Sequence, residues 1–170
     1  LIERLTFVIV ASNSYSRLRS VLMGQTITME YAETKEELFF ALFKTWSYNP
    51  VSTLTLCLLT KNYELAYRLM PRFTQIEMDT SKLIALGSLV QLIESPVFVN
   101  LRLELIRTDK RSQYLQKTLL QILMLMPLSK SFNSLKKRMQ CISITNSSNV
   151  IEDSEDEYKR FFGDVYQLKD

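Results

Sequence analysis

Hydrophobic residues recur at intervals of three and four positions along most of the first 142 residues of the chain. In the segment "ETKEELFFALFKTW" the apolar side chains follow this spacing, which is typical of an amphipathic helix. The full pattern predicts helices near residues 1–10, 14–23, 33–48, 50–60, 62–76, 80–95, 96–107, 110–126 and 129–141. We therefore predict an all-α domain over residues 1–142.

Proline and capping residues mark the expected helix ends. Asn49 before Pro50 places an N-cap ahead of a proline at the first helical position, and Ser95 before Pro96 repeats this pattern 46 residues later. Helix pairs with this spacing favour a HEAT-like helical repeat, an α-solenoid, although the two segments share little beyond "PV".

Two further signals concern single helices. Thr34 and Glu37 form a possible capping box at the start of the helix near 33–48. Pro71 is expected to break or kink the helix that begins near Asn62, because proline removes a backbone donor and its ring collides with the preceding turn.

The segment "PVSTLTLCLL", residues 50–59, is apolar almost all round. A short helix of this kind is buried between neighbours, and its threonine hydroxyls can bond back to the backbone. A β-strand is the alternative, since the window alone is ambiguous, but the runs around it are helical in spacing. We predict a buried helix with Leu54 and Leu58 at its centre.

Composition argues against catalysis within the chain. The sequence has no histidine, which removes the commonest general base and metal ligand, and it has no glycine-rich phosphate-binding motif. Only three glycines occur in 170 residues, which disfavours hairpins and phosphate loops and favours long helices with short turns. We expect no enzyme activity, no cofactor and no metal.

Cysteine usage and hydropathy predict the setting. Cys57 and Cys141 lie in separate apolar contexts, which predicts two buried thiols in a reducing compartment. The longest apolar run, "LLQILMLMPL", is about half the length of a bilayer-spanning helix. These features predict a soluble, cytosolic protein.

One basic cluster lies in the last helix of this domain. Its members are Lys130, Lys136, Lys137 and Arg138. A solvated helix face is the simplest interpretation, and a contact with an acidic partner or with anionic lipid is the sharper one. Nucleic acid is disfavoured, because no aromatic residues alternate with these cations.

The sequence predicts a different organisation beyond residue 142. Residues 143–154 are polar and predict a linker, whereas residues 155–170 predict an amphipathic C-terminal helix. The apolar stripe of that helix consists of Tyr158, Phe161, Phe162, Val165 and Leu168. This stripe can pack back onto the domain or contact another protomer or a different protein, so it is a candidate oligomer or partner contact.

Three ordered blocks carry a family resemblance: "TWSYNPVSTLTLCLLTKNYELAY", "LVQLIESPVFVNLRLELI" and "LLQILMLMPLSKSFNSLKKRMQCI". Together they resemble the C-terminal region of the vacuole-morphology scaffold (Vac-fourteen) family, the HEAT-repeat proteins of the PIKfyve-type lipid kinase complex. The likeness covers roughly Glu36 to Ile142.

The resemblance implies a non-catalytic scaffold that self-associates and binds two enzymes of opposite sense. One is a PIKfyve-type 5-kinase acting on phosphatidylinositol 3-phosphate, and the other is a Sac-domain phosphatase acting on the 3,5-bisphosphate. It implies a peripheral location on the cytosolic face of vacuolar or late endosomal membranes. The alternative reading from the residues is a peripheral lipid-binding module that uses the basic cluster.

Overall fold

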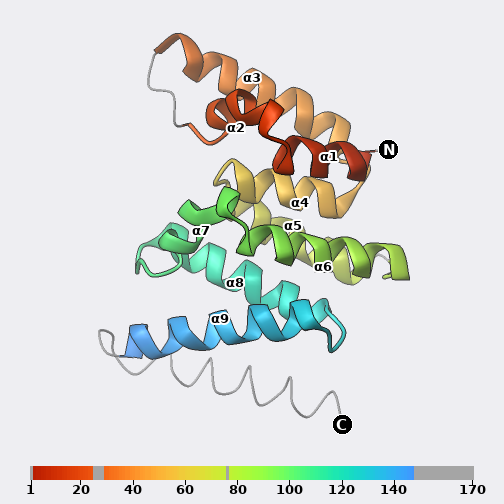
Figure 1. Ribbon diagram of the computed structural model, residues 1–170, viewed down its shortest axis with the longest axis vertical. Coiled ribbons are helices and arrows are strands. Elements are labelled where there is room, and N and C mark those ends of the chain that lie inside the picture. Colours follow the sequence, from red (N-terminus) through yellow and green to blue (C-terminus); the bar gives the residue numbers. More distant parts are fainter. Residues whose placement is uncertain (1, 25–28, 76, 148–170) are drawn as a thin grey trace.

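The computed structural model describes residues 2–24, 29–75 and 77–147, and these residues form helices joined by short connections (Figure 1). The α-helices are α1 (Ile2–Ala11), α2 (Ser16–Leu22), α3 (Met29–Trp46), α4 (Pro50–Leu59), α5 (Tyr63–Gln75), α6 (Thr80–Glu94), α7 (Val99–Glu104), α8 (Lys110–Leu125) and α9 (Lys130–Ser147). Single turns of 3-10 helix, Asn13–Tyr15 and Pro96–Phe98, precede α2 and α7. Since the described residues contain no strand, the prediction of an all-α helical repeat is confirmed.

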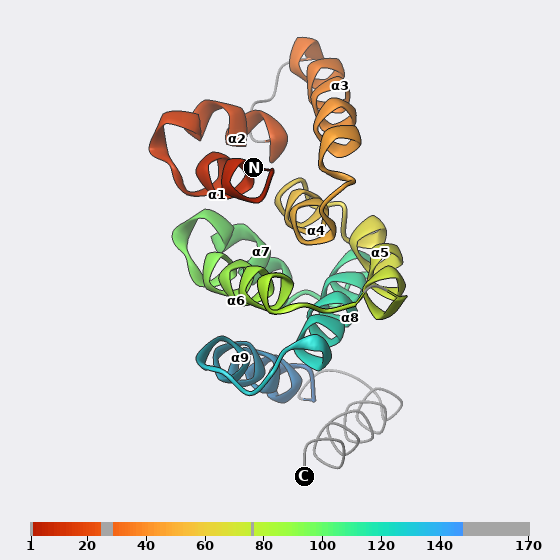
Figure 2. The ribbon, with the colours of Figure 1, turned by 90° about the vertical axis from the view of Figure 1, so that its right-hand side faces the viewer.

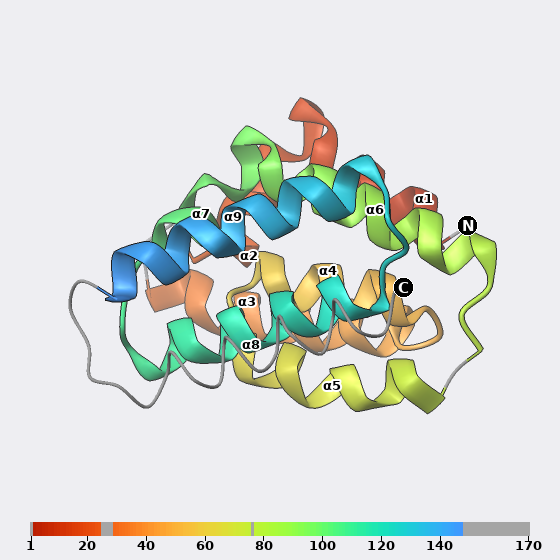
Figure 3. The same cartoon turned by 90° about the horizontal axis from the view of Figure 1, so that it is seen from below.

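The helices stack in two layers along the long axis of the molecule. Figure 2 shows α1 with α2, α6 with α7, and α9 above one another in one layer, while α3, α4, α5 and α8 form the other. The view along the stack in Figure 3 separates the same two groups. Side chains from both layers meet in one continuous core, as expected for stacked helical units that bury their apolar faces against neighbours.

Helix α4 lies at the centre of this core. All of its residues from Val51 to Leu59 are buried, and Leu54 is fully so. The Asn49 side chain accepts a hydrogen bond from the Ser52 backbone N–H at 3.0 Å, which caps the helix as its sequence predicts. The buried-helix prediction is confirmed.

The threonines of this segment satisfy their hydroxyl groups locally. The hydroxyl of Thr53 donates to the Trp46 carbonyl at 2.7 Å. Those of Thr55 and Thr60 donate to carbonyls four residues earlier, at 2.8 and 2.9 Å. Because buried hydroxyls are costly without partners, these bonds explain how three threonines are tolerated in the core.

A structural repeat joins the N-terminal helices to the middle of the chain, with equivalent residues 83 positions apart. Residues 12–19 read "SNSYSRLR" and residues 95–102 read "SPVFVNLR". In both places a longer helix ends, one 3-10 turn follows, and a short helix carries an arginine back to the end of the first helix. Nη1 of Arg102 donates to the carbonyls of Ile93 and Ser95 at 2.5 and 2.6 Å.

Arg19 makes a similar pair of bonds at the end of α1. Its Nη1 donates to the carbonyl of Ile9 at 2.9 Å and also to that of Ser12. Each arginine thereby donates to carbonyls where a helix ends. The carbonyls of Ser12 and Ser95 also accept the backbone N–H groups of Tyr15 and Phe98, both at 3.3 Å. The 46-residue proline spacing does not mark this repeat, since α4 lies in the other layer from α6 and α7.

Several predicted boundaries need correction. Because α3 begins at Met29, Thr34 lies inside the helix and the predicted capping box is wrong. Pro71 lies within α5, which continues to Gln75, so the proline does not break the helix. Ser95 makes no side-chain cap for the 3-10 turn that follows it.

Helix α9 also runs further than its composition suggests. It ends at Ser147 and therefore includes residues 143–147, the first part of the predicted linker. Extending a formed helix adds a hydrogen bond for each residue fixed, so polar residues can continue one that is already packed. The rest of the linker and the predicted helix 155–170 lie outside the described residues.

The two cysteines differ in their surroundings. Cys57 is fully buried in α4, and this burial raises the pKa of its thiol to about 12. Cys141 is exposed on α9, so the prediction of two buried thiols is wrong for this residue. Its neighbours Met139 and Ile142 are buried instead, which places Cys141 on the outward side of the helix.

Candidate protein-binding surfaces

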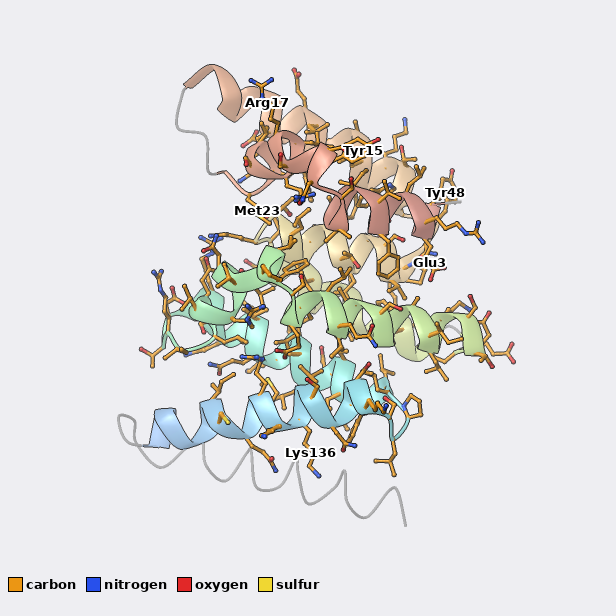
Figure 4. All side chains as sticks on the ribbon, in the orientation of Figure 1. Glu3, Tyr15, Arg17, Met23, Tyr48 and Lys136 are labelled. Atoms are coloured by element: carbon orange, nitrogen blue, oxygen red, sulfur yellow. The ribbon has the colours of Figure 1, made fainter. Side chains whose placement is uncertain are left out.

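The structure separates the members of the predicted basic cluster. Arg138 turns towards α6, where its Nε donates to the Glu94 carboxylate at 2.6 Å and its Nη2 bonds the other carboxylate oxygen. Hydrogen bonding to Glu94 raises the pKa of Arg138. Lys136 lies on the opposite side of α9, with its Nζ 6.0 Å from the Phe132 ring centroid (Figure 4). Of the four residues, Lys130 and Lys137 are exposed, whereas Lys136 and Arg138 are half-buried.

The predicted C-terminal contact cannot be placed in the same way. Tyr158, Phe161, Phe162, Val165 and Leu168 all lie outside the described residues.

A groove of about 710 Å³ lies where α3, the start of α5 and the start of α8 meet. We call it the α3–α5–α8 groove. Its cationic lining residues are Lys61, Arg68, Lys110 and Arg111, and its aromatic ones are Phe39, Phe40, Tyr63 and Tyr114. Phe40 is 67% exposed, whereas Tyr63 is buried in the wall.

The turn between α4 and α5 builds one end of the groove. Lys61 has φ = 62°, in the left-handed region that usually favours glycine. The Asn62 N–H donates to the Cys57 carbonyl at 2.9 Å, and the Lys61 N–H donates to that of Leu58 at 3.3 Å. This is the paired-bond helix ending in which the residue after the C-cap is left-handed.

Interactions of Lys61 explain why a side chain is kept at this strained position. Its Nζ binds the Glu104 carboxylate at 2.8 Å, and its carbonyl accepts a hydrogen bond from Arg111 Nη2 at 3.0 Å. The guanidinium carbon of Arg111 also lies 6.0 Å from the centroid of the Tyr63 ring. Residues from three separate segments are thereby fixed around one turn.

Charge interactions set the protonation of the groups at this turn. Burial by itself would raise the pKa of Glu104, but the hydrogen bond and charge of Lys61, with a contribution from Tyr63, hold it below its usual value. Burial, together with the Glu104 carboxylate, raises the pKa of the Tyr63 hydroxyl. Glu104 is therefore expected to stay ionised and to anchor Lys61.

We expect acid to remove the contribution of Glu104 to stability. The pKa of Glu104 is lower in the folded chain than its usual 4.5, so its stabilising effect is present above that pH and is lost as the pH falls through the folded pKa. In Glu104→Gln no such loss can occur. Urea unfolding across a pH series should show the stability gap between the two proteins closing below about pH 4.5.

Glu64→Gln is the matched control, because the Glu64 carboxylate pairs with Arg68 on an exposed helix face. Exposed pairs of this kind contribute little, so its stability should follow that of the unchanged chain at every pH. Parallel stability curves for the unchanged chain and Glu104→Gln would contradict the assignment.

A second exposed surface lies on α7 and the turn after it. Val99, Leu103 and Ile106 are 44%, 59% and 57% exposed, and their spacing places them on one side of a helix. We call them the α7 apolar stripe. Apolar side chains grouped on a surface are typical of a protein contact.

The described residues offer no alternative chemistry. They contain no group of three or more His, Cys, Asp or Glu side chains able to hold a metal ion. Within them, too, no single helix is long and apolar enough to cross a membrane. By length and composition alone α6 could do so together with Pro96–Glu104, as a pair bent by 67°.

Sequence reasoning missed both surfaces. The groove lining comes from three segments separated along the chain, and the α7 apolar stripe falls in a run predicted simply as a helix. A usable signal was present in residues 61–68 and 110–114, where lysine and arginine occur within a few residues of tyrosine.

Comparison with known proteins identifies relatives for nearly the whole described region. The family model described as "Vacuolar protein 14 C-terminal Fig4p binding" matches residues 1–142. The VAC14 homologue of Schizosaccharomyces pombe is 42% identical over 116 residues, which are 68% of this chain and 14% of that protein. Vacuole morphology and inheritance protein 14 of Saccharomyces cerevisiae is 41% identical over 113 residues, 66% of this chain and 13% of that protein.

A more distant relative extends the match. The VAC14 homologue of Arabidopsis thaliana is 32% identical over 143 residues, 84% of this chain and 19% of that protein. The matched region therefore spans less than a fifth of each of these relatives. No solved structure matches the chain.

Proposed function

The chain belongs to the family of vacuolar protein 14 C-terminal Fig4p-binding domains, and we propose that it is a non-catalytic scaffold that holds a Sac-type phosphoinositide phosphatase. The observation that carries this proposal is the family match over residues 1–142, whose description specifies Fig4p binding. The resemblance drawn from the sequence supplies the chemical class of that partner, a Sac-domain phosphatase acting on phosphatidylinositol 3,5-bisphosphate.

The ionisable groups with shifted pKa values support a scaffold over an enzyme. Within the described residues, Cys57 lies in the core, Tyr63 is buried in the groove wall, Glu104 is paired with Lys61, and Arg138 is paired with Glu94. Catalytic groups with shifted pKa values usually line a cleft where a substrate can reach them. Here each shift is explained by packing or by a structural ion pair.

The α7 apolar stripe is the surface that we assign to the phosphatase. Interfaces draw most of their binding energy from a few side chains that lose water on contact. Leu103 and Ile106 are both more than half exposed in the chain alone, so a partner has apolar area to cover there.

A binding measurement with a purified Fig4-type Sac phosphatase tests this assignment. Leu103→Asp with Ile106→Asp should weaken binding by about tenfold or more, since each charge would lose water at the contact without a partner. Ile84→Asp is the matched control, because Ile84 is 63% exposed at the far end of α6. Unchanged binding by the double variant would overturn the surface assignment, and no binding by the unchanged chain would overturn the function.

The wider complex is part of the same proposal. We infer that the chain self-associates and also binds a PIKfyve-type 5-kinase, so that both enzymes of the 3,5-bisphosphate cycle are held together. One relative is named for vacuole morphology, which supports a peripheral location at vacuolar or late endosomal membranes. Light scattering of the purified chain tests self-association directly, because a monomer mass would contradict it.

A further inference from the structure

The chemistry of the α3–α5–α8 groove selects for an acidic and aromatic occupant. Arg68, Lys110 and Arg111 are exposed along it, and Phe40 presents most of its ring to solvent. The acidic neighbours Glu64 and Glu104 are already paired with Arg68 and Lys61. An occupant with carboxylates beside aromatic rings would meet the positive charge of Lys110 and Arg111, the net positive charge of the groove and an apolar wall together.

The same chain contains a segment of this kind. Residues 152–157 read "EDSEDE", with five carboxylates in six residues, and Tyr158, Phe161 and Phe162 follow them. The acidic part and the aromatic part therefore occur in one short stretch, which matches a groove lined by both cations and aromatic rings.

The position of α9 brings that segment within reach. Helix α9 ends at Ser147, on the side of the molecule where α8 begins at Lys110 (Figures 1 and 3). Four residues lie between Ser147 and Glu152, and an extended chain spans roughly 17 Å over the five steps from one to the other. Packed helices lie about 8–10 Å apart, so this length covers the distance from α9 across α8 towards α5.

We propose that the α3–α5–α8 groove is the docking site for the chain's own C-terminal segment, residues 152–162. Its carboxylates face Arg68, Lys110 and Arg111, and its aromatic side chains cover Phe39, Phe40 and Tyr114. A short tether gives a segment a local concentration in the millimolar range, which favours the same chain over a second copy. This inference goes beyond the scaffold role and gives a use to the candidate contact residues Tyr158, Phe161 and Phe162.

Isotope-resolved cross-linking tests the location and the origin of the occupant. Equal amounts of unlabelled and ¹⁵N-labelled full chain are mixed and treated with a carbodiimide, which joins amines to carboxylates that are in contact. We expect Lys110 linked to residues 152–157, always within chains of one isotope. Mixed-isotope pairs would show a second copy in the groove, and links from this segment to other lysines alone would place it elsewhere. Either outcome overturns the proposal.

Charge reversal in the full chain provides an independent test. Arg68→Glu with Lys110→Glu should lower the hydrogen-exchange protection of residues 152–162 by about tenfold, the population shift expected when a weak tethered contact is lost. Arg72→Glu with Lys117→Glu is the matched control, since both residues are exposed on α5 and α8 but do not line the groove.

Restoring the charge match should restore the contact. Adding Asp156→Lys and Glu157→Lys to the groove variant should bring back protection, because positive charge on the segment then faces negative charge in the groove. Failure to restore it, equal loss in the control variant, or no protection in the unchanged chain would each overturn the proposal. None of these results depends on the phosphatase, so a failed scaffold test and a failed docking test remain distinguishable.

Discussion

Leu54→Ala should lower the free energy of unfolding by about 2–5 kcal/mol, the largest effect expected of any single substitution considered for this chain. Leu54 is fully buried in α4, and α4 packs against helices of both layers. Removing its branched end leaves a cavity that the surrounding helices fill only in part, so the lost contacts add to the lost burial. Leu58→Ala, one turn further along the same face, should behave similarly.

Urea unfolding followed by circular dichroism measures this loss. Leu128→Ala is the matched control, because Leu128 is 68% exposed after α8 and its truncation should change stability by less than about 0.5 kcal/mol. If the Leu54 variant unfolded at the same urea concentration as the control, α4 would not be the centre of the core.

The second large effect is expected at Arg102. Arg102→Met keeps an unbranched apolar stem but removes the donors to the carbonyls of Ile93 and Ser95. Carbonyls at a helix end that lose a charged donor are left partly unsatisfied, which should cost about 1–3 kcal/mol. The loss should appear as a lower midpoint of thermal unfolding.

Arg107→Met separates this effect from a general effect of removing charge. Arg107 is exposed in the turn before α8, so its replacement should leave the midpoint nearly unchanged. Equal midpoints for the two variants would mean that the Arg102 hydrogen bonds add nothing to the junction of α6 and α7.

Local signals were sufficient to predict the helices and their centre. Apolar spacing, the Asn49–Pro50 start and the all-round hydrophobicity of residues 50–59 depend on neighbours within one or two turns, and the structure confirms each of them. The capping box at Thr34 was wrong because a capping sequence can also occur inside a helix that begins earlier.

Features that depend on distant segments were not predictable in this way. Arg138 reads as one member of a basic run, yet its partner Glu94 lies 44 residues earlier on α6. The groove requires α3, α5 and α8 to meet, and nothing in the periodicity of one helix specifies which others lie beside it. The left-handed backbone conformation of Lys61 could not be predicted from its neighbours either, since the Glu104 carboxylate that binds its side chain comes from α7.

Because one cysteine is exposed and the other is buried, the rates at which a thiol reagent labels them can measure how often the core opens. A thiol reagent added to the native chain reaches Cys141 directly, whereas Cys57 becomes accessible only when the helices around α4 separate. The labelling rate of Cys141 would thus report the reactivity of the reagent, and the labelling rate of Cys57 would report the opening of the core. Weakening the packing around α4 should speed the second rate and leave the first unchanged.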